Sequence, residues 1–300
     1  MSTLEKKVGE NYEGLSIREF LKEELELSTR LIRSAALEQR ILVNNEPVRM
    51  RHRLHEGDEV VVKLQRKESQ NIIPEKIDLN IIYEDSDILV LNKQPYIVVH
   101  PTRSYPTGTL ANGILYYFNE TKQDCIVRLV SRLDMNTSGL IIIGKNQFAH
   151  MALSKEMKEN NLEKRYLAIV QGHLKEKEGT IDAPIYRPEG DEFGIQRIID
   201  ERGQRSITHY KVVERFKDGD LVECLLETGR THQIRVHLSH LGHPIYGDTL
   251  YGNGNEEMEL IPRQALHAYG LDFKSPRTKE ILSLRAELPD DMKELIKKIS

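Results

Sequence analysis

Residues 129–145 constrain the fold more than any other part of the chain. They read Leu-Val-Ser-Arg-Leu-Asp-Met-Asn-Thr-Ser-Gly-Leu-Ile-Ile-Ile-Gly-Lys, so two polar turns precede the apolar run at 140–143. A run of this length after turn residues predicts a buried strand. Asp134 then stands on a loop held by that strand, as active-site carboxylates often do. The alternative is a turn aspartate that only accepts hydrogen bonds from nearby amides, which is the commoner case for an isolated residue.

The same stretch carries a family resemblance. Arg-Leu-Asp at 132–134, Thr-Ser-Gly-Leu at 137–140 and Lys145 resemble the signature of the RluA/RluD family of RNA pseudouridine synthases. The resemblance implies that Asp134 is the catalytic aspartate. It also implies that Arg132 fills the gap left when a uridine is flipped out of the RNA, a step needed because a stacked base cannot reach an enzyme pocket.

Further blocks between residues 76 and 292 are similar to the same family. The strand-like segment around Tyr166 resembles Lys-x-Tyr-x-Ala-x-Val-x-Gly, and residues 229–235 read Gly-Arg-Thr-His-Gln-Ile-Arg. The resemblance implies that Tyr166 stacks on the target base. It also places Arg230 in the active site, where we expect an ion pair with Asp134. Thr231 is expected to cap the helix that follows.

Composition limits the remaining possibilities. The formal charge of −4 over 300 residues gives no overall attraction to nucleic acid, so any basic surface must be local. Cys125 and Cys224 lie far apart in apolar contexts, which indicates buried thiols in a reducing compartment. The chain shows neither the apolar segment of a signal peptide nor a run long enough to cross a membrane, so we expect a cytoplasmic protein without membrane contact.

The first 70 residues predict a separate basic module. Ser16 and Glu19 fit a capping box, and a second helix is followed by strands near residues 41–48 and 59–64. This order is similar to the S4 RNA-binding module. By itself, the local excess of positive charge is more often a solvated surface. The S4 resemblance implies that the arginines of this module contact RNA phosphates. The arginines concerned are Arg30, Arg33, Arg40, Arg49, Arg51 and Arg53.

These patterns and the resemblance together predict an α+β protein. We expect an S4-like domain at residues 13–70, a polar linker at 65–71, and a catalytic domain at residues 76–300. The resemblance implies that the catalytic domain has the pseudouridine synthase fold, built on a mixed, largely antiparallel β-sheet.

The histidines at 232, 237, 240 and 243 raise the question of a metal site. No carboxylate stands at a ligand spacing such as His-Glu-x-x-His, and neither cysteine is nearby. We therefore expect no metal. The isomerisation of uridine needs no redox change, so no cofactor is expected either.

Three functions remain to be compared. The first is isomerisation of specific uridines in structured RNA, ribosomal before transfer RNA, by a monomeric enzyme. The second is a non-catalytic RNA-binding or ribosome-assembly factor on the same scaffold, which loss of Asp134 or of the Gly229-Arg230 turn would indicate; both are present. The third is a glycoside hydrolase, but no second carboxylate accompanies Asp134 in the recognised blocks.

Overall fold

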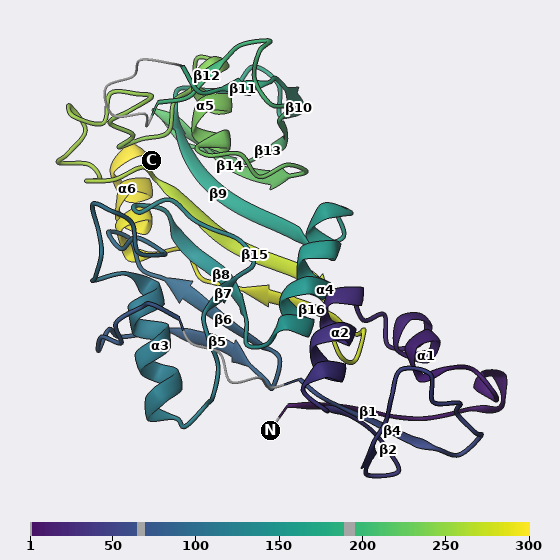
Figure 1. Cartoon of the computed structure of the whole chain (residues 1–300). Helices are drawn as coiled ribbons and strands as arrows, with labels where there is room; N and C mark the ends of the chain where they lie inside the picture. The colour runs from purple at the N-terminus through teal and green to yellow at the C-terminus, as the bar shows by residue number, and fades with distance from the viewer. Residues whose placement is uncertain (1, 65–69, 189–195) are drawn as a thin grey trace.

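The structure, a computed structural model, describes residues 2–64, 70–188 and 196–300. In these segments the chain forms a small sheet near the N-terminus, a large sheet through the rest of the molecule, and a two-stranded ribbon (Figure 1). Most of the expected linker at 65–71 falls outside the described residues. No helix in the described segments is long and apolar enough to span a membrane. Cys224 is buried, whereas Cys125 is only half-buried.

The N-terminal module (residues 2–64) is an antiparallel sheet in the order β1-β4-β2-β3 with two helices packed against it. The capping box is confirmed, since Ser16 Oγ accepts from the Glu19 amide and the Glu19 carboxylate accepts from the Ser16 amide. The expected start at residue 13 is wrong, because β1 pairs along its whole length with β4 and belongs to this sheet. The elements are β1 (Thr3–Lys7), η1 (Glu10–Tyr12), α1 (Ile17–Glu23), α2 (Thr29–Leu37), β2 (Ile41–Val43), β3 (Glu46–Pro47) and β4 (Glu59–Lys63).

The large sheet has the order β10-β13-β14-β9-β15-β8-β6-β5, with β16 beside β15 and β7 beside β8. In the described part of the chain, neighbouring strands of this sheet are antiparallel except for β8 and β15, which are parallel. The expected α+β class with a mixed, largely antiparallel sheet is therefore confirmed. Its strands are β5 (Ile81–Glu84), β6 (Ile88–Lys93), β7 (Arg128–Leu129), β8 (Ser138–Gly144), β9 (Glu163–Gln171), β10 (Glu178–Asp182), β13 (Ile207–Arg215), β14 (Gly219–Leu226), β15 (Leu266–Lys274) and β16 (Ile281–Arg285).

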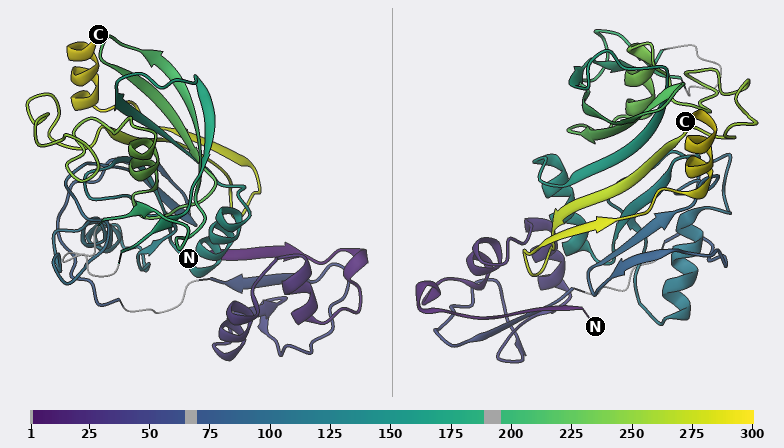
Figure 2. Two further views of the ribbon diagram at one scale, coloured as in Figure 1. Left: turned by 90° about the horizontal axis from the view of Figure 1, so that it is seen from above. Right: turned by 180° about the vertical axis from the view of Figure 1, so that it is seen from behind.

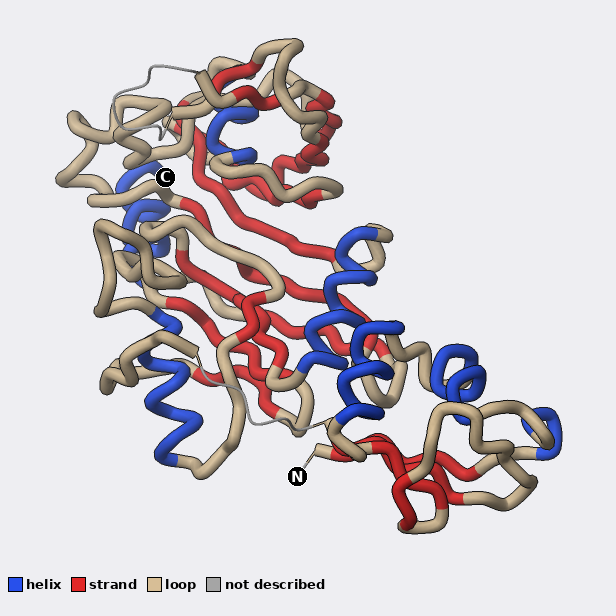
Figure 3. Tube along the Cα trace, in the orientation of Figure 1, coloured by secondary structure: helices blue, strands red, loops and turns tan. Residues whose placement is uncertain are grey.

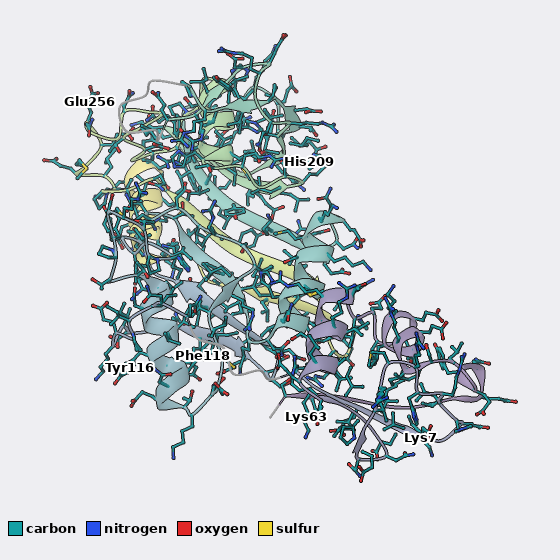
Figure 4. All side chains as sticks on the ribbon, in the orientation of Figure 1. Lys7, Lys63, Tyr116, Phe118, His209 and Glu256 are labelled. Atoms are coloured by element: carbon teal, nitrogen blue, oxygen red, sulfur yellow. The ribbon has the colours of Figure 1, made fainter. Side chains whose placement is uncertain are left out.

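Helices cover the sheet from both faces, and Figure 3 shows them around a continuous band of strands. Leu89 and Ile141 pack with Phe118 of α3, which is labelled in Figure 4, while Val90 and Ile142 pack on the α4 side. This alternation follows from the two-residue period of β6 and β8. The remaining elements are α3 (Leu110–Glu120), α4 (Gln147–Lys158), β11 (Ile185–Tyr186), β12 (Ile198–Ile199), α5 (Gln233–His240) and α6 (Asp290–Ile299).

The N-terminal module is docked on the part of the chain that forms the large sheet. Phe148 of α4 packs into the module's apolar core. Arg277 forms a forked ion pair with Asp87, at 2.7 and 2.9 Å, and also donates to the Thr3 carbonyl. Both views in Figure 2 show the module at one end of the molecule. Ligands bound to the module are therefore held in a defined position relative to the large sheet.

Gly139 lies at the parallel junction of β8 and β15. Its φ is +115°, and a Cβ there would lie 2.3 Å from the Ala268 carbonyl oxygen. We expect Gly139→Ala to lower the free energy of unfolding by roughly 2–5 kcal/mol, because the residue gains both backbone strain and a backbone clash. Denaturant unfolding measures this. Gly9→Ala is the control, since a Cβ at Gly9 meets nothing within 4 Å; equal stability of the two variants would contradict the prediction.

Candidate active site

Asp134 lies on the loop between β7 and β8, where the two halves of the large sheet join. The Thr137 amide donates to the Asp134 carbonyl at 3.1 Å, which closes a turn. The Asp134 side chain is 27% exposed and faces a hollow of about 60 Å³. We call it the Asp134 hollow; its walls include Arg132, Leu133, Thr137, Tyr166, Arg230, His232 and Arg235.

Two buried cations hold the turn that follows Asp134. Lys93 Nζ donates to the Met135 carbonyl at 2.9 Å and to two further carbonyls, so its three donors are all used. Burial and the charge of Arg263 lower the pKa of Lys93 to about 7, while three carbonyl acceptors favour its charged form. Arg263 donates to the Asn136 carbonyl at 3.1 Å. These hydrogen bonds fix the backbone next to Asp134 and thereby the direction of its side chain.

Arg235 of α5 pairs with Asp134. Its Nη1 lies 3.2 Å from Asp134 Oδ2, and its Nε and Nη2 donate to the two oxygens of Asp248 at 2.7 and 2.9 Å. Arg235 and Asp248 are both buried. Burial lowers the pKa of Arg235, but its pairing with Asp248 and Asp134 more than offsets this, so the pKa lies above its usual value. The Arg235 guanidinium therefore lies between the partly exposed carboxylate of Asp134 and the fully buried carboxylate of Asp248.

His232 forms part of the wall beside Asp134. Its Nε2 lies 3.9 Å from Asp134 Oδ2, and its Nδ1 lies 2.8 Å from the Tyr251 hydroxyl. That hydroxyl accepts from the Arg197 amide at 2.9 Å, so its own proton is available to Nδ1. Burial lowers the pKa of His232, which favours the neutral ring. The neutral tautomer consistent with these contacts carries its proton on Nε2, toward the Asp134 hollow.

Tyr166 of β9 closes the other side of the hollow. It is 7% exposed, and within the described segments its hydroxyl has no hydrogen-bond partner. Burial, and then the charge of Asp134, raise the pKa of Tyr166. The hydroxyl is therefore neutral near pH 7 and can donate to a ligand in the hollow.

The other histidines of the expected cluster make separate contacts. His237 lies between Thr208 Oγ1 and the Ala183 carbonyl, and His243 Nδ1 lies 2.9 Å from the Gln171 carbonyl. Across the described residues, no three His, Cys, Asp or Glu side chains are grouped so as to hold a metal ion. What the Asp134 hollow offers is an oriented carboxylate, a fixed cation and neutral donors.

Known proteins resemble both parts of the chain. Residues 87–240, just over half of its length, match the RNA pseudouridylate synthase family, and residues 4–60 match the RluD ribosomal pseudouridine synthase N-terminal domain. The chain belongs to the RNA pseudouridylate synthase family. Members of this family isomerise uridine in RNA to pseudouridine, so the expected enzyme class is confirmed.

Relatives extend the likeness over most of the chain. The uncharacterized RNA pseudouridine synthase YjbO of Bacillus subtilis is 44% identical, over 85% of this chain and 89% of its own. Ribosomal large subunit pseudouridine synthase D of Nitrosomonas europaea is 34% identical, over 99% and 88%. The solved structure of human RNA Pseudouridylate Synthase Domain Containing 1 is 30% identical with a TM-score of 0.58, covering 70% of this chain and 83% of that one.

In this pseudouridylate synthase, the expected ion pair between Arg230 and Asp134 is wrong. Arg230 is exposed, and its Nε donates to the Arg205 carbonyl at 3.3 Å. The partner of Asp134 is Arg235, five residues further on in the same block. Arg230 still lines the Asp134 hollow together with Arg132 and Tyr166.

The start of α5 explains this error. His232, with φ of 59°, is the N-cap residue, and Thr231 is exposed and does not cap the helix. The Gln233 side chain instead accepts from the Arg230 amide at 3.0 Å and from Thr228 Oγ1 at 2.9 Å. With the helix beginning at Gln233, its first turn directs Arg235 into the protein. The helical pattern of residues 234–241 was a usable signal, since Arg235 adjoins its apolar face.

One arginine of the N-terminal module also needs correction. Arg40 is 8% exposed, and its guanidinium donates to Ser34 Oγ, the Glu38 carboxylate and the Lys63 carbonyl. These contacts connect the end of α2 to β4, so Arg40 does not present its charge to RNA. The other five are exposed: Arg30, Arg33, Arg49, Arg51 and Arg53.

We expect Tyr166→Phe to keep the fold and RNA affinity of this pseudouridylate synthase but to lower kcat about 10- to 100-fold. The ring still fills the wall, whereas the neutral hydroxyl that faces the hollow is lost. Single-turnover rates and Kd for RNA separate the two effects. Tyr210→Phe, on β13, which is separated from β9 by β14, is the control. Full activity of Tyr166→Phe would leave the hydroxyl no chemical part.

Proposed function

We propose that the protein converts uridines of large-subunit ribosomal RNA to pseudouridine with Asp134 as its catalytic aspartate. The observation that carries the proposal is the position of the Asp134 carboxylate, held by Arg235 at the edge of a hollow that Tyr166 closes. Two relatives, from Nitrosomonas europaea and Xanthomonas campestris, match 99% and 85% of this chain and are named for the large ribosomal subunit, which supports the choice of RNA.

The reaction breaks the bond from ribose C1′ to uracil N1 and forms one from C1′ to C5. C5 loses its proton and N1 gains one, so the product is an isomer of uridine. It needs a carboxylate at the sugar, and Asp134 either attacks C1′ or removes a sugar proton. The guanidinium of Arg235 keeps this carboxylate oriented and favours its ionised form. Oxidation states do not change overall, so the proposal includes no cofactor and no metal.

The detached uracil must be held while it turns. Tyr166 stacks on the ring, and His232 Nε2 and the Tyr166 hydroxyl offer protons to its oxygens. Arg132 and Arg230 are the exposed side chains in the lining of the Asp134 hollow, and in this proposal Arg132 fills the gap that the flipped nucleotide leaves in the RNA.

The five exposed arginines of the N-terminal module bind RNA phosphates in this proposal. Replacing Arg30, Arg33 and Arg49 together by glutamine is expected to weaken RNA binding and to make its salt dependence shallower by about two to three phosphate contacts, with kcat at saturating RNA little changed. The full-length protein is used because Phe148 packs into the module. Equal salt slopes for the triple variant and the wild type would make these arginines an ordinary solvated surface.

The groups proposed at the Asp134 hollow require no second copy of the chain, and the enzyme is proposed to act as a monomer. Its RNA substrate supports a cytoplasmic location. The second candidate, a non-catalytic assembly factor, would not need a carboxylate held in place as Asp134 is by Arg235.

Mapping pseudouridines tests the proposal. Deleting the gene should remove one or more pseudouridines from large-subunit RNA, and the wild-type gene should restore them while the Asp134→Asn gene does not. Transfer RNA is mapped in parallel as the alternative substrate. An unchanged pseudouridine pattern in ribosomal RNA would overturn the substrate assignment, and restoration by Asp134→Asn would overturn the role of Asp134.

A further inference from the structure

A second hollow, larger and rich in arginine, lies beside the first. Its volume is about 510 Å³, and Arg132 and Arg230 line both. Among the residues that the structure describes, its lining includes no aspartate or glutamate. We call it the arginine hollow, after Arg132, Arg187, Arg197, Arg202 and Arg230.

Three separate segments contribute these arginines. Arg132 comes from the loop before β8, and Arg230 from the turn between β14 and α5. The other three flank the ribbon of β11 and β12, which pairs Ile185 with Ile199. Residues so far apart in sequence are gathered only by the fold, in a chain whose formal charge is −4.

Ion pairs with the described residues compensate part of the charge of this hollow. Arg202 forms a forked ion pair with Asp200, at 2.9 and 2.7 Å, and its guanidinium lies 4.4 Å from the Tyr186 ring centroid. For Arg132, Arg187 and Arg230, the described part of the chain supplies no carboxylate within ion-pair distance. Clustered guanidiniums repel one another, and their planar forks match the oxygens of phosphate.

We propose that the arginine hollow binds backbone phosphates of the RNA strand next to the flipped nucleotide. The inference rests on the proposed function, because the nucleotide in the Asp134 hollow determines which phosphates come close. Arg132 and Arg230 belong to both walls, so a strand entering one hollow passes the other. Phosphates held here fix the sugar of the target relative to Asp134.

This site is distinct from the basic surface of the N-terminal module. Figure 1 shows β11, β12 and α5 at the opposite end of the molecule from α1 and α2. A structured RNA can reach both, whereas a short single strand in the active site reaches only the arginine hollow. The two contributions to affinity can therefore be measured separately.

The probe is a short oligouridylate, bound to the full-length Asp134→Asn protein so that no turnover occurs. Arg187→Gln should bind it roughly tenfold more weakly, and the salt slope should fall by about 0.7, with a further similar loss when Arg230→Gln is added. The matched control is Arg205→Gln, which removes the same charge from the neighbouring segment. Arg205 is exposed, pairs with Asp182 and does not line the hollow. Its affinity and slope should stay at the parent values.

A neutral-backbone probe provides an independent measurement. Oligouridylate with methylphosphonate linkages beside the central uridine should bind the parent protein more weakly, and Arg187→Gln should then cause no further loss. Non-additivity of this kind marks a direct contact. Additive losses would overturn the proposal, as would equal slopes for parent and Arg187→Gln, or equal losses for Arg187→Gln and Arg205→Gln.

The outcomes separate this proposal from the proposed function. If active protein modifies no large-subunit RNA but the slope difference persists, the substrate assignment fails and the phosphate site remains. If the RNA is modified and Arg187→Gln leaves KM and slope unchanged, the function remains and the phosphate site fails.

Discussion

Replacing Asp134 by asparagine is expected to reduce pseudouridine formation at least a thousandfold. The amide has nearly the size of the carboxylate, but it neither attacks C1′ nor accepts a proton from the sugar at neutral pH. Tritium released from C5-labelled RNA measures the loss. Asp124→Asn, an exposed aspartate in the same connection between α3 and β8, should retain full activity.

The fold and RNA affinity of Asp134→Asn should stay close to wild type. Arg235 keeps its forked pair with the buried Asp248, so no buried charge is left without a partner. We expect the free energy of unfolding to change by about 1 kcal/mol or less. Activity within tenfold of wild type, in a variant that binds RNA normally, would remove Asp134 from the chemistry.

Arg235→Lys is expected to lower both activity and stability. Lysine keeps one positive charge but cannot donate in parallel to both oxygens of Asp248 while also reaching Asp134. Because Asp248 is fully buried, we expect a loss of roughly 1–3 kcal/mol in the free energy of unfolding and at least about a hundredfold in kcat. Denaturant unfolding and single-turnover rates measure the two losses.

Arg230→Lys is the informative comparison for this prediction. Its guanidinium is exposed and contacts a backbone carbonyl, so lysine there should leave stability unchanged and mainly raise KM for RNA. The reverse ranking, with Arg230→Lys losing more kcat than Arg235→Lys, would contradict the assignment of Arg235 as the partner of Asp134.

Local structure followed from the sequence wherever short-range physics decides it. The capping box of Ser16 and the apolar run that became β8 both depend on residues within a few positions of one another. Hydrogen bonds at helix ends and the period of apolar side chains are local quantities. Individual strand-turn-strand segments could be predicted for the same reason. The order of the strands in the sheet depends on long-range pairing and could not be predicted.

Family likeness, rather than periodicity, singled out Asp134 and Tyr166. An aspartate in a turn and a tyrosine on a strand are common structural residues, and nothing local separates the catalytic case. Their common hollow depends on the register of β9 with β15 and on the parallel pairing of β15 with β8. Such long-range pairings cannot be recognised in the sequence of either segment alone.

The sequence and its family resemblance together predicted the α+β class, and the sequence by itself predicted several helices and strands and an aspartate loop before a buried strand. Only the tertiary structure decided which arginine serves Asp134, that Arg40 is used internally, that β1 completes the N-terminal sheet, and that five arginines surround one hollow. The physical reason is that side-chain direction depends on where a helix begins and on which distant segments pack against it. Whether an arginine pairs with Asp134, bonds to nearby backbone groups or faces bound RNA therefore depends on its position in the fold.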